Sequence, residues 1–389
     1  MNVNKSKMKK TSLLILICLM CSPVSSQAKN SLPTIQSEGM SINVEKVAQG
    51  FGVPWGMVFL SSNKLLVTDR NGPVRLYYLD QSKKLKLKKL PSVKAEGQGG
   101  MLDVAIPPDY KAGGWIYFTY VKEVNGEGAT VLARGKLETD RFSHWQELLV
   151  TKSTSNKSYH FGSRISFDDK GHVFFGIGDR GKRSNAQNLK NHAGSIIRLN
   201  LDGTIPDDNP YNLKSNNKKQ AALPEIWSYG HRNPQGLIYD FKNKRLWSNE
   251  HGPRGGDEIN LILPGHNYGW PVISYGKEYW GPIDVGEGTH RKGMSQPVKV
   301  YTPSIAPGSL MLYTGDTYPE WKGNLFSGAL KLRHINRIVL DEVGKVIKEE
   351  RLLEKLNKRI RTLAQSPKGR IYFSTDDGTI YRLNVLENH

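Results

Sequence analysis

The stretch KGHVFFGIGDRG, residues 170–181, runs from a turn through β-branched and aromatic residues to small and acidic residues. This order recurs, at spacings of roughly 45 to 80 residues, in five further stretches: NKLLVTDRNG (63–72), GGWIYFTY (113–120), NKRLWSNEHG (243–252), KGNLFSGALK (322–331) and KGRIYFSTDDG (368–378). Short apolar runs bounded by Gly, Asn and Asp are typical of strands, and few segments have the pattern of a long amphipathic helix. Regular repeats of this kind indicate propeller blades. We therefore predict an all-β fold, a six-bladed β-propeller with four-stranded antiparallel blades, with a pair of β-sandwiches as the alternative.

The glycines of GIGDRG (176–181) also fit the dinucleotide-binding pattern G-x-G-x-x-G. That pattern requires a strand before it and a helix after it. The stretch that follows, KRSNAQNLKNH, is polar throughout and has no apolar stripe at helical spacing. We reject dinucleotide binding and expect these glycines to allow close backbone packing.

The first 28 residues have the features of a secretory signal. A lysine-rich start (Lys5, Lys7, Lys9, Lys10) precedes the apolar run 13–20 and the small-residue site Ser26-Gln27-Ala28. The alternatives are an uncleaved anchor, for which about ten apolar residues are too short, and a lipoprotein, for which Met20 before Cys21 is a poor fit. We expect removal of residues 1–28, a single propeller domain over residues 29–389, a periplasmic location and no stable membrane insertion.

Cysteine and charge limit the classes of function. Cys18 and Cys21 both lie in the predicted signal, so the mature chain would have no disulfide, thiolate metal ligand or cysteine nucleophile. The formal net charge is +19, or +15 without the four signal lysines. No basic helix with interleaved aromatic residues is present, so we expect no nucleic acid partner; KKLKLKK (83–89) is typical of a charged edge strand. A solvated basic surface and a multiply anionic small ligand both remain open.

The segment YHFGSRISFDDKGHVFFGIGD, residues 159–179, has two β-type runs around the turn DDKG. A two-residue loop, Asp169-Lys170, would place Phe167 opposite His172 and His160 opposite Asp179. Directly opposed side chains have Cβ atoms about 5 Å apart. A carboxylate that holds one ring N–H fixes the histidine tautomer and leaves the other nitrogen as a base. The alternative is a purely structural pair.

The run SNEHGPRGGDEINLILPGHNYGWP, residues 248–271, has features of a calcium site. Gly252 and Pro253 can expose two successive backbone carbonyls, and Asp257 and Glu258 supply carboxylates, which are ligands that Ca²⁺ prefers. The string GGDE also begins a GGDEF-like motif, but Ile259 follows it, and we reject that interpretation.

Several cationic residues are candidates for binding an anion. GHRNPQG (230–236) contains Arg232 and Asn233 in a loop broken by proline. In RIR (359–361), Arg359 and Arg361 would share one face of a strand, an arrangement that suits a carboxylate or phosphate ligand. The alternative is solvated surface charge.

Together these segments resemble the soluble PQQ-dependent aldose sugar dehydrogenases, within the soluble quinoprotein glucose dehydrogenase family. The resemblance runs from about residue 50 to the C-terminus and is carried by VPWGMVFL, GQGGMLDVAIPPDY, HFGSRISF, GIGDRG, SYGHRNPQGL, EHGPRGGDEINLI, HNYGWPVISYGKEYWGP, PSIAPGSLMLY, GALK and RIR. It implies oxidation of aldose sugars at C1 to the lactone, with pyrroloquinoline quinone (PQQ) and Ca²⁺ as cofactors and an unidentified electron acceptor. Loop insertions of the glucose branch are absent, so we expect a monomer.

The resemblance also implies roles for particular residues. His160 would be the general base for the anomeric hydroxyl and Asp179 its orienting partner. Arg232 would lie near the quinone oxygen that becomes negative. Gln98, Asn233 and Tyr279 would contact PQQ, and Lys331, Arg359 and Arg361 would neutralise its carboxylates. The backbone carbonyls of Gly252 and Pro253 would bind a catalytic calcium. Glu258 and Tyr268 would hold a second, structural calcium.

Two alternatives to this function stay open, and one residue departs from the family. Six-bladed propellers also include calcium-dependent lactonases, which need side-chain carboxylates around an axial metal. A non-enzymatic binding propeller would not need the histidine and the cationic residues to converge. The glucose branch has an acidic residue directly before the catalytic histidine, whereas this chain has Tyr159, to which no role is assigned.

Overall fold

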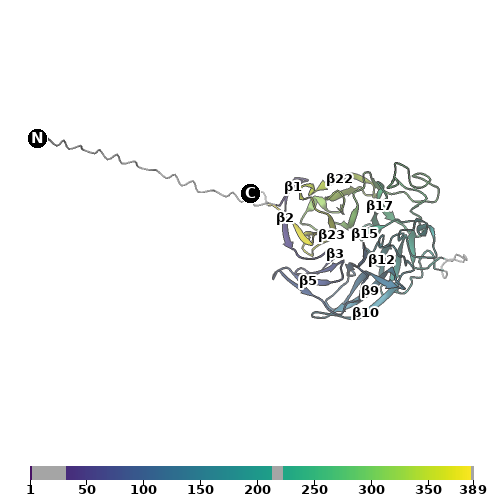
Figure 1. Ribbon diagram of the computed structural model, residues 1–389, viewed down its shortest axis with the longest axis horizontal. Coiled ribbons are helices and arrows are strands. Elements are labelled where there is room, and N and C mark those ends of the chain that lie inside the picture. Colours follow the sequence, from purple (N-terminus) through teal and green to yellow (C-terminus); the bar gives the residue numbers. More distant parts are fainter. Residues whose placement is uncertain (2–31, 213–221, 387–389) are drawn as a thin grey trace. The chain divides into compact units, whose positions relative to one another are not determined.

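The computed structural model describes Met1 and residues 32–212 and 222–386. Six antiparallel sheets are arranged around a central axis (Figure 1), and the first strand of each sheet contacts the first strand of the next until β23 meets β3. The predicted all-β, six-bladed propeller is confirmed. The predicted signal, residues 1–28, lies outside the described residues apart from Met1. In the described part of the chain, no helix is long and apolar enough to cross a membrane.

Each of the first five blades is formed by four strands that follow one another in the sequence. Blade 1 consists of β3 (Pro54–Ser61), β4 (Lys64–Asp69), β5 (Val74–Tyr78) and β6 (Lys83–Lys86). Blade 2 consists of β7 (Met101–Ala105), β8 (Trp115–Val124), β9 (Glu127–Leu137) and β10 (Phe142–Val150). Blade 3 consists of β11 (Ile165–Phe167), β12 (His172–Ile177), β13 (Ser195–Asn200) and β14 (Ile226–Tyr229). Blade 4 consists of β15 (Pro234–Asp240), β16 (Arg245–Glu250), β17 (Asp257–Ile262) and β18 (Lys299–Tyr301). Blade 5 consists of β19 (Pro307–Leu312), β20 (Leu325–Ala329), β21 (Ile335–Leu340) and β22 (Val346–Leu352).

The sixth blade joins the two ends of the propeller. Its inner strands come from the C-terminal part of the chain: β23 (Ile360–Gln365), β24 (Ile371–Thr375) and β25 (Thr379–Val385). Its fourth strand, β2 (Met40–Ala48), comes from the N-terminal part and pairs with β25, with Val44 opposite Leu383. A fifth strand, β1 (Thr34–Ser37), is added outside β2. This pairing closes the ring with backbone hydrogen bonds between segments far apart in the sequence.

The six sequence repeats mark the second strand of every blade: β4, β8, β12, β16, β20 and β24. A second strand is flanked by two others in its own sheet and by neighbouring blades on both faces. Both faces are therefore buried, and its apolar residues form a continuous run instead of alternating with polar ones. In β12 five of the six residues are buried. This double burial explains why the repeat is visible in the sequence.

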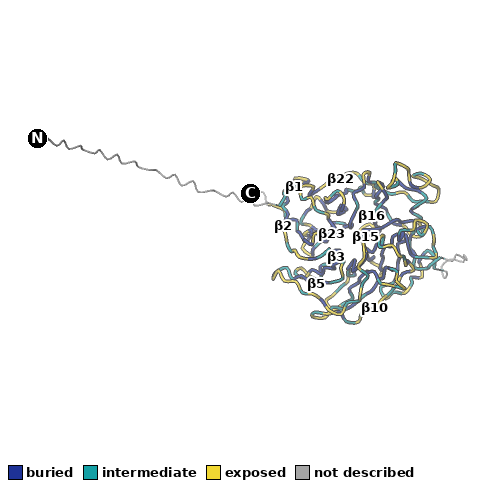
Figure 2. Tube along the Cα trace, in the orientation of Figure 1, coloured by how far each residue is buried: buried dark blue, intermediate teal, exposed yellow. Residues whose placement is uncertain are grey.

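The apolar core is divided among the interfaces between adjacent blades. Six large clusters each combine residues of two neighbouring blades; Trp321 and Phe373 lie in the cluster between blades 5 and 6. Exposed positions concentrate on the outer strands (Figure 2). The lysine cluster predicted as an edge strand (83–89) is confirmed over its first four residues, which form β6, the outermost strand of blade 1.

The predicted register of the β11–β12 hairpin is wrong by one residue. Phe167 lies opposite Val173, not His172. The Asp168 carboxylate accepts hydrogen bonds from the backbone N–H groups of Lys170 and His172, both at 2.9 Å, and Gly171 has a φ of +83°. These interactions stabilise a longer loop that ends in a left-handed glycine, a common hairpin connection. His160 lies outside the hairpin, in the loop before β11 (Ile165–Phe167).

Arg164 ties the six blades together at the axis. It precedes β11 in blade 3, forms an ion pair with Asp103 of blade 2 at 2.9 Å, and stacks on Trp55 of blade 1 with its guanidinium 3.9 Å from the ring centroid. Its remaining N–H groups donate to backbone carbonyls of blades 4, 5 and 6, at Gln235, Gly308 and Arg361. A single buried side chain therefore contacts every blade.

Candidate active site

The predicted site residues come mainly from two kinds of loop. Gln98, His160, Arg232, Asn233 and Arg359 precede the first strand of a blade, whereas Asp179, Gly252, Pro253 and Lys331 follow a second strand. Neighbouring strands in a blade are antiparallel, so the start of the first strand and the turn after the second lie at the same end of the blade. The fold thus gathers residues from distant parts of the sequence at one end of the axis.

His160 and Asp179 form the contact expected from the sequence. The His160 Nδ1 atom lies 2.7 Å from Asp179 Oδ1. The other carboxylate oxygen of Asp179 accepts the indole N–H of Trp270 at 2.8 Å, and Oδ1 also accepts the Gly181 backbone N–H at 2.8 Å. With three donors around it, the carboxylate is fixed in place and fixes the imidazole.

The electrostatics favour a neutral imidazole beside an ionised carboxylate. Burial lowers the pKa of His160 below its ordinary value, against the opposing effect of the hydrogen bond to Asp179. Burial alone would raise the pKa of Asp179, but the hydrogen bond from His160 lowers this pKa, as do the Gly181 N–H and the charge of Arg232. No residue in the described part of the chain bonds to His160 Nε2. That nitrogen is therefore available as a base.

The backbone around His160 is held in an uncommon conformation. His160 has a φ of +59°, and its N–H donates to the side-chain carbonyl of Gln98 at 2.9 Å. Arg180 is fully buried and donates to the backbone carbonyls of Lys157, Tyr159 and Gly128. Such positive φ values in non-glycine residues persist where surrounding contacts impose them. The motif GIGDRG thus holds both the side chain and the backbone of His160, through Asp179 and Arg180 respectively.

Arg232 lies next to this pair. Its Nη1 donates to the carbonyls of His251 and Gly252, at 3.0 and 2.6 Å, and its Nη2 lies 3.4 Å from the exposed Tyr279 hydroxyl. Its guanidinium packs over the Trp270 ring at 5.3 Å. Trp270 therefore contacts both Asp179 and Arg232.

Asn233 offers an unused donor. It is fully buried, and its side-chain oxygen accepts hydrogen bonds from the Gly162 N–H and the Gln235 amide. Its Nδ2 has no partner among the described residues. Buried polar groups normally have hydrogen-bond partners, so this donor indicates a place for a bound acceptor.

The predicted anion-binding residues gather in blades 5 and 6. Arg361 forms a bidentate pair with Asp376, at 2.8 and 3.0 Å, and Arg359 donates to the same carboxylate at 2.8 Å. Arg359 also donates to the Leu330 carbonyl, adjacent to Lys331. The Lys331 side chain is exposed and has no ion-pair partner in the part of the chain that the structure describes. The Asp376 carboxylate is therefore shared by two guanidinium groups, those of Arg359 and Arg361.

All four predicted metal residues, Gly252, Pro253, Glu258 and Tyr268, line one small cavity. Its volume is about 20 Å³, enough for a single water or ion. Glu250, which the sequence did not predict, also lines it and lies opposite Glu258 across β16 and β17. Burial raises the pKa of Glu258, and the charge of Glu250 raises it further. Two crowded carboxylates beside backbone carbonyls suit a hard cation.

One residue of the predicted calcium segment has a different role. Asp257 was expected to supply a metal ligand, but its two oxygens accept the backbone N–H groups of Gly252 and Ala306 at 2.8 and 2.7 Å. It shapes the Gly252-Pro253 turn. Among the described residues, no three histidine, cysteine or acidic side chains converge as a metal site. Backbone carbonyls would therefore complete any coordination here.

The residues that the sequence analysis missed share a position in the repeat. An acidic residue stands at or just after the end of the second strand in four blades, namely Asp69, Asp179, Glu250 and Asp376. Each binds a cation, a histidine or backbone N–H groups at the loop end of its blade. Aligning the repeats on this acid would have identified Glu250 and Asp376. No comparable signal marks Trp270.

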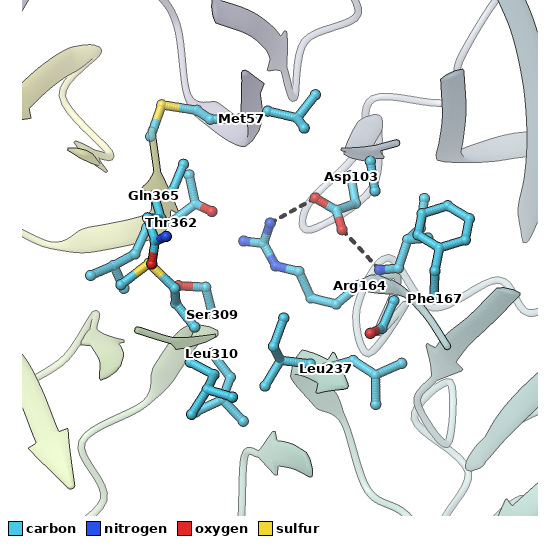
Figure 3. A pocket seen from close by; sticks show the side chains of 18 of the residues that line it. Met57, Asp103, Arg164, Phe167, Leu237, Ser309, Leu310, Thr362 and Gln365 are labelled. Carbon is cyan, nitrogen blue, oxygen red and sulfur yellow. Dashed lines mark hydrogen bonds and ion pairs between the residues drawn. The ribbon is translucent and has the colours of Figure 1, made fainter. Parts of the chain in front are cut away.

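A second, larger cavity of about 350 Å³ contains none of the predicted site residues. It is lined by the first strands of all six blades, with apolar side chains such as Met57, Leu237 and Leu310 around the Arg164–Asp103 pair (Figure 3). Its two charged side chains, Arg164 and Asp103, are hydrogen-bonded to each other and to backbone groups.

Comparison with known proteins gives a consistent result. The family model described as glucose / sorbosone dehydrogenase matches residues 51–382. An aldose sugar dehydrogenase of Escherichia coli is 37% identical over 352 residues, covering 89% of this chain and 93% of that protein. A crystal structure of a glucose dehydrogenase superposes with a TM-score of 0.84 at 35% identity, covering 89% and 100% of the two chains. The PQQ-bound form of an aldose sugar dehydrogenase from Streptomyces coelicolor superposes with a TM-score of 0.72 at 25% identity, covering 89% of this chain and 98% of that one.

Proposed function

The chain belongs to the glucose/sorbosone dehydrogenase family, and from this premise we propose that it is a periplasmic oxidoreductase that oxidises aldose sugars at C1 to lactones, using PQQ and Ca²⁺. The PQQ-bound relative supports the cofactor. The periplasmic location rests on the predicted signal at residues 1–28. An unidentified acceptor would reoxidise the enzyme, which we expect to act as a monomer.

The residues at the loop end of the axis fit PQQ, which carries three carboxylates. Lys331, Arg359 and Arg361 would bind those carboxylates, because their positive charge exceeds what Asp376 offsets. The unpaired Asn233 Nδ2 supplies a buried donor, and Gln98, Arg232 and Tyr279 complete the proposed set. When bound, PQQ supplies an electrophilic quinone carbonyl that accepts the hydride from C1 of the sugar.

Calcium fits the cavity beside Arg232. The carbonyls of Gly252 and Pro253 and the carboxylates of Glu250 and Glu258 are oxygen donors of the type that Ca²⁺ prefers, and a cation there would offset the repulsion between the two glutamates. Tyr268 lines the same cavity. Positive charge held by these residues would help to stabilise negative charge that develops on the bound cofactor during the reaction.

His160 is the proposed general base. Its Nδ1–H is held by Asp179, so Nε2 would take the proton of the anomeric hydroxyl while the hydride leaves C1. Asp179 would stabilise the imidazolium that forms. Arg232 would be placed to stabilise negative charge, as its guanidinium is fixed by two backbone carbonyls and the Trp270 ring.

The single observation that carries the proposal is the intact His160–Asp179–Trp270 arrangement beside Arg232. A non-enzymatic propeller has no need of a tautomer-fixed histidine with a free nitrogen. A calcium-dependent lactonase needs carboxylates around an axial metal, whereas the axis here is occupied by the Arg164 guanidinium. The dehydrogenase is therefore the better-supported function.

Dye reduction with glucose, measured on the purified mature protein with and without added PQQ and Ca²⁺, tests the proposal. We expect activity only when both are present. The His160→Ala variant serves as the matched control, because it should bind PQQ normally and yet be inactive. No activity on a panel of aldoses, together with no PQQ binding by absorbance or calorimetry, would overturn the proposal.

A further inference from the structure

Arg70 and Arg180 occupy the same position in the repeats of blades 1 and 3. Each directly follows the acidic residue at the loop end of a second strand, Asp69 or Asp179. Their surroundings differ. The Arg180 guanidinium is fully buried against backbone carbonyls, whereas Arg70 is half-buried and its guanidinium makes no hydrogen bond or ion pair with any residue that the structure describes. Arg70 is thus the repeat arginine whose hydrogen-bonding capacity is unused.

The backbone of Arg70 is firmly placed beside the candidate site. Its N–H donates to the Val53 carbonyl at 3.0 Å, and its carbonyl accepts the Met101 N–H at 3.1 Å. Gly100 has a φ of +138°, and a Cβ there would lie 1.8 Å from the Arg70 carbonyl oxygen. The turn of blade 1 is therefore packed tightly on the GQGG segment that contains Gln98, the residue bonded to the His160 backbone.

The charges around Arg70 are not balanced by the protein. Burial, and then the positive charge of Arg361, lower the pKa of Arg70, and Asp376 and Asp69 act in the opposite direction. Both of these carboxylates are already engaged. Asp376 binds Arg359 and Arg361, and Asp69 binds Arg75 and backbone N–H groups. Partly desolvated like charges repel unless an anion lies between them.

We propose that Arg70 is a binding residue for a carboxylate of the cofactor, acting from blade 1 beside the cations of the adjacent blade 6 and of blade 5. This inference rests on the proposed function. Arg70, Lys331, Arg359 and Arg361 provide four positive charges, of which Asp376 offsets one, and the remaining three match the three carboxylates of PQQ. Arg70 also gives blade 1 a residue at the site, where the sequence analysis placed none.

The test is PQQ affinity, measured by equilibrium dialysis on the apo-protein, with Arg70→Gln compared with wild type. Loss of a charge-assisted hydrogen bond should weaken binding by about tenfold to a hundredfold. The matched control is Lys86→Gln, which removes the same charge from the exposed edge strand β6 of the same blade, and should bind PQQ within about twofold of wild type. Arg70→Lys, which keeps the charge but not the planar fork, should give an intermediate affinity.

The outcomes separate this inference from the function it rests on. If wild type does not bind PQQ, the proposed function fails, and this assignment with it. If wild type binds and Arg70→Gln binds within twofold, only the assignment of Arg70 is overturned. Circular dichroism and the melting temperature check that the variants are folded. If Arg70→Gln does not fold, the affinity of Arg70→Lys for PQQ is the deciding measurement. Wild-type affinity with an unchanged salt dependence in Arg70→Lys would count against direct binding of PQQ by the Arg70 guanidinium.

Discussion

The two ends of the propeller axis are formed by the same six blades, yet their chemistry differs. At one end, loops bring together a histidine, two glutamates and a group of arginines. Toward the other, the midpoints of the first strands line a mainly apolar cavity of about 350 Å³. Arg164 lines this cavity and bonds to the backbone of Arg361, which belongs to the charged end.

This difference follows from what each kind of segment must do for the fold. A strand midpoint has to fit the pleat and pack against both neighbouring blades, so its residue types are limited. A loop after a second strand is under fewer packing constraints, so it can carry polar side chains. We therefore expect substitutions at the loop end to affect catalysis and substitutions in the apolar cavity to affect stability.

The largest effect expected at the loop end is that of His160→Ala. Removing a general base should lower kcat by about 10²- to 10⁴-fold, because the variant loses the imidazole Nε2 that would take the proton. The melting temperature and PQQ affinity should change little. Dye-coupled kinetics and calorimetry on the same preparation measure all three. A kcat within tenfold of wild type would show that another group is the base.

Arg164→Met tests the boundary between the two ends. It leaves Asp103 buried without its partner, which should cost ~3–5 kcal/mol of unfolding free energy, measured by urea denaturation. In the double variant Arg164→Met with Asp103→Leu no unpaired charge remains, so most of this loss should be recovered. A single variant as stable as wild type would mean that the contacts of Arg164 with six blades contribute little.

Leu310→Ala tests the apolar end. Leu310 is buried in the interface of blades 4 and 5, and its truncation should lower stability by ~2–3 kcal/mol. The kcat per folded molecule should stay within about twofold, since the substitution leaves the loop end untouched. If kcat fell as far as in His160→Ala, the proposed division between the two ends would be wrong.

The pH dependence of kcat/KM sharpens the assignment of the base. The base is active when neutral, so activity should be lost as the pH falls through the pKa of His160, which burial places below its ordinary value of 6.5. The hydrogen bond to Asp179 raises this pKa. Asp179→Asn should therefore move the acid limb of the profile to lower pH while reducing kcat. A shift to higher pH would contradict the arrangement described here.

Tyr279→Phe should have the smallest effect. The hydroxyl is exposed and lies 3.4 Å from Arg232, so its loss should weaken PQQ binding by about threefold at most. Equilibrium dialysis measures it, with Arg232→Gln as the comparison, for which a larger loss is expected. Equal losses in the two variants would assign Tyr279 a larger role than its exposure indicates.

The sequence was sufficient to predict the second strands and the contact between His160 and Asp179. Residues of doubly buried strands form continuous apolar runs, so all six repeats were recognisable. The His160–Asp179 contact followed from hairpin proximity, although the register was wrong because the Asp168 side chain and Gly171 stabilise a longer loop. The error of one residue in the register did not separate His160 from Asp179, because both residues lie in loops beyond the paired strands β11 and β12.

Other features depend on contacts between segments far apart in the sequence. The indole of Trp270 lies 91 positions from the Asp179 carboxylate that it binds, and β2 closes the ring by pairing with β25. Local patterns record propensity and periodicity, and they hold no information about which loops meet across an axis.

By itself the sequence determined the fold class, the six repeats and the residue types of a cationic, oxygen-rich site, since each of these is set by local burial and side-chain chemistry. Only the tertiary structure decided that four metal candidates line one cavity and that the Asp257 carboxylate binds backbone N–H groups of a turn. It also decided that the Arg70 guanidinium has no partner among the described residues, whereas the Arg180 guanidinium has three. These outcomes depend on which backbone atoms lie within hydrogen-bond distance in the folded chain, which local sequence patterns do not specify.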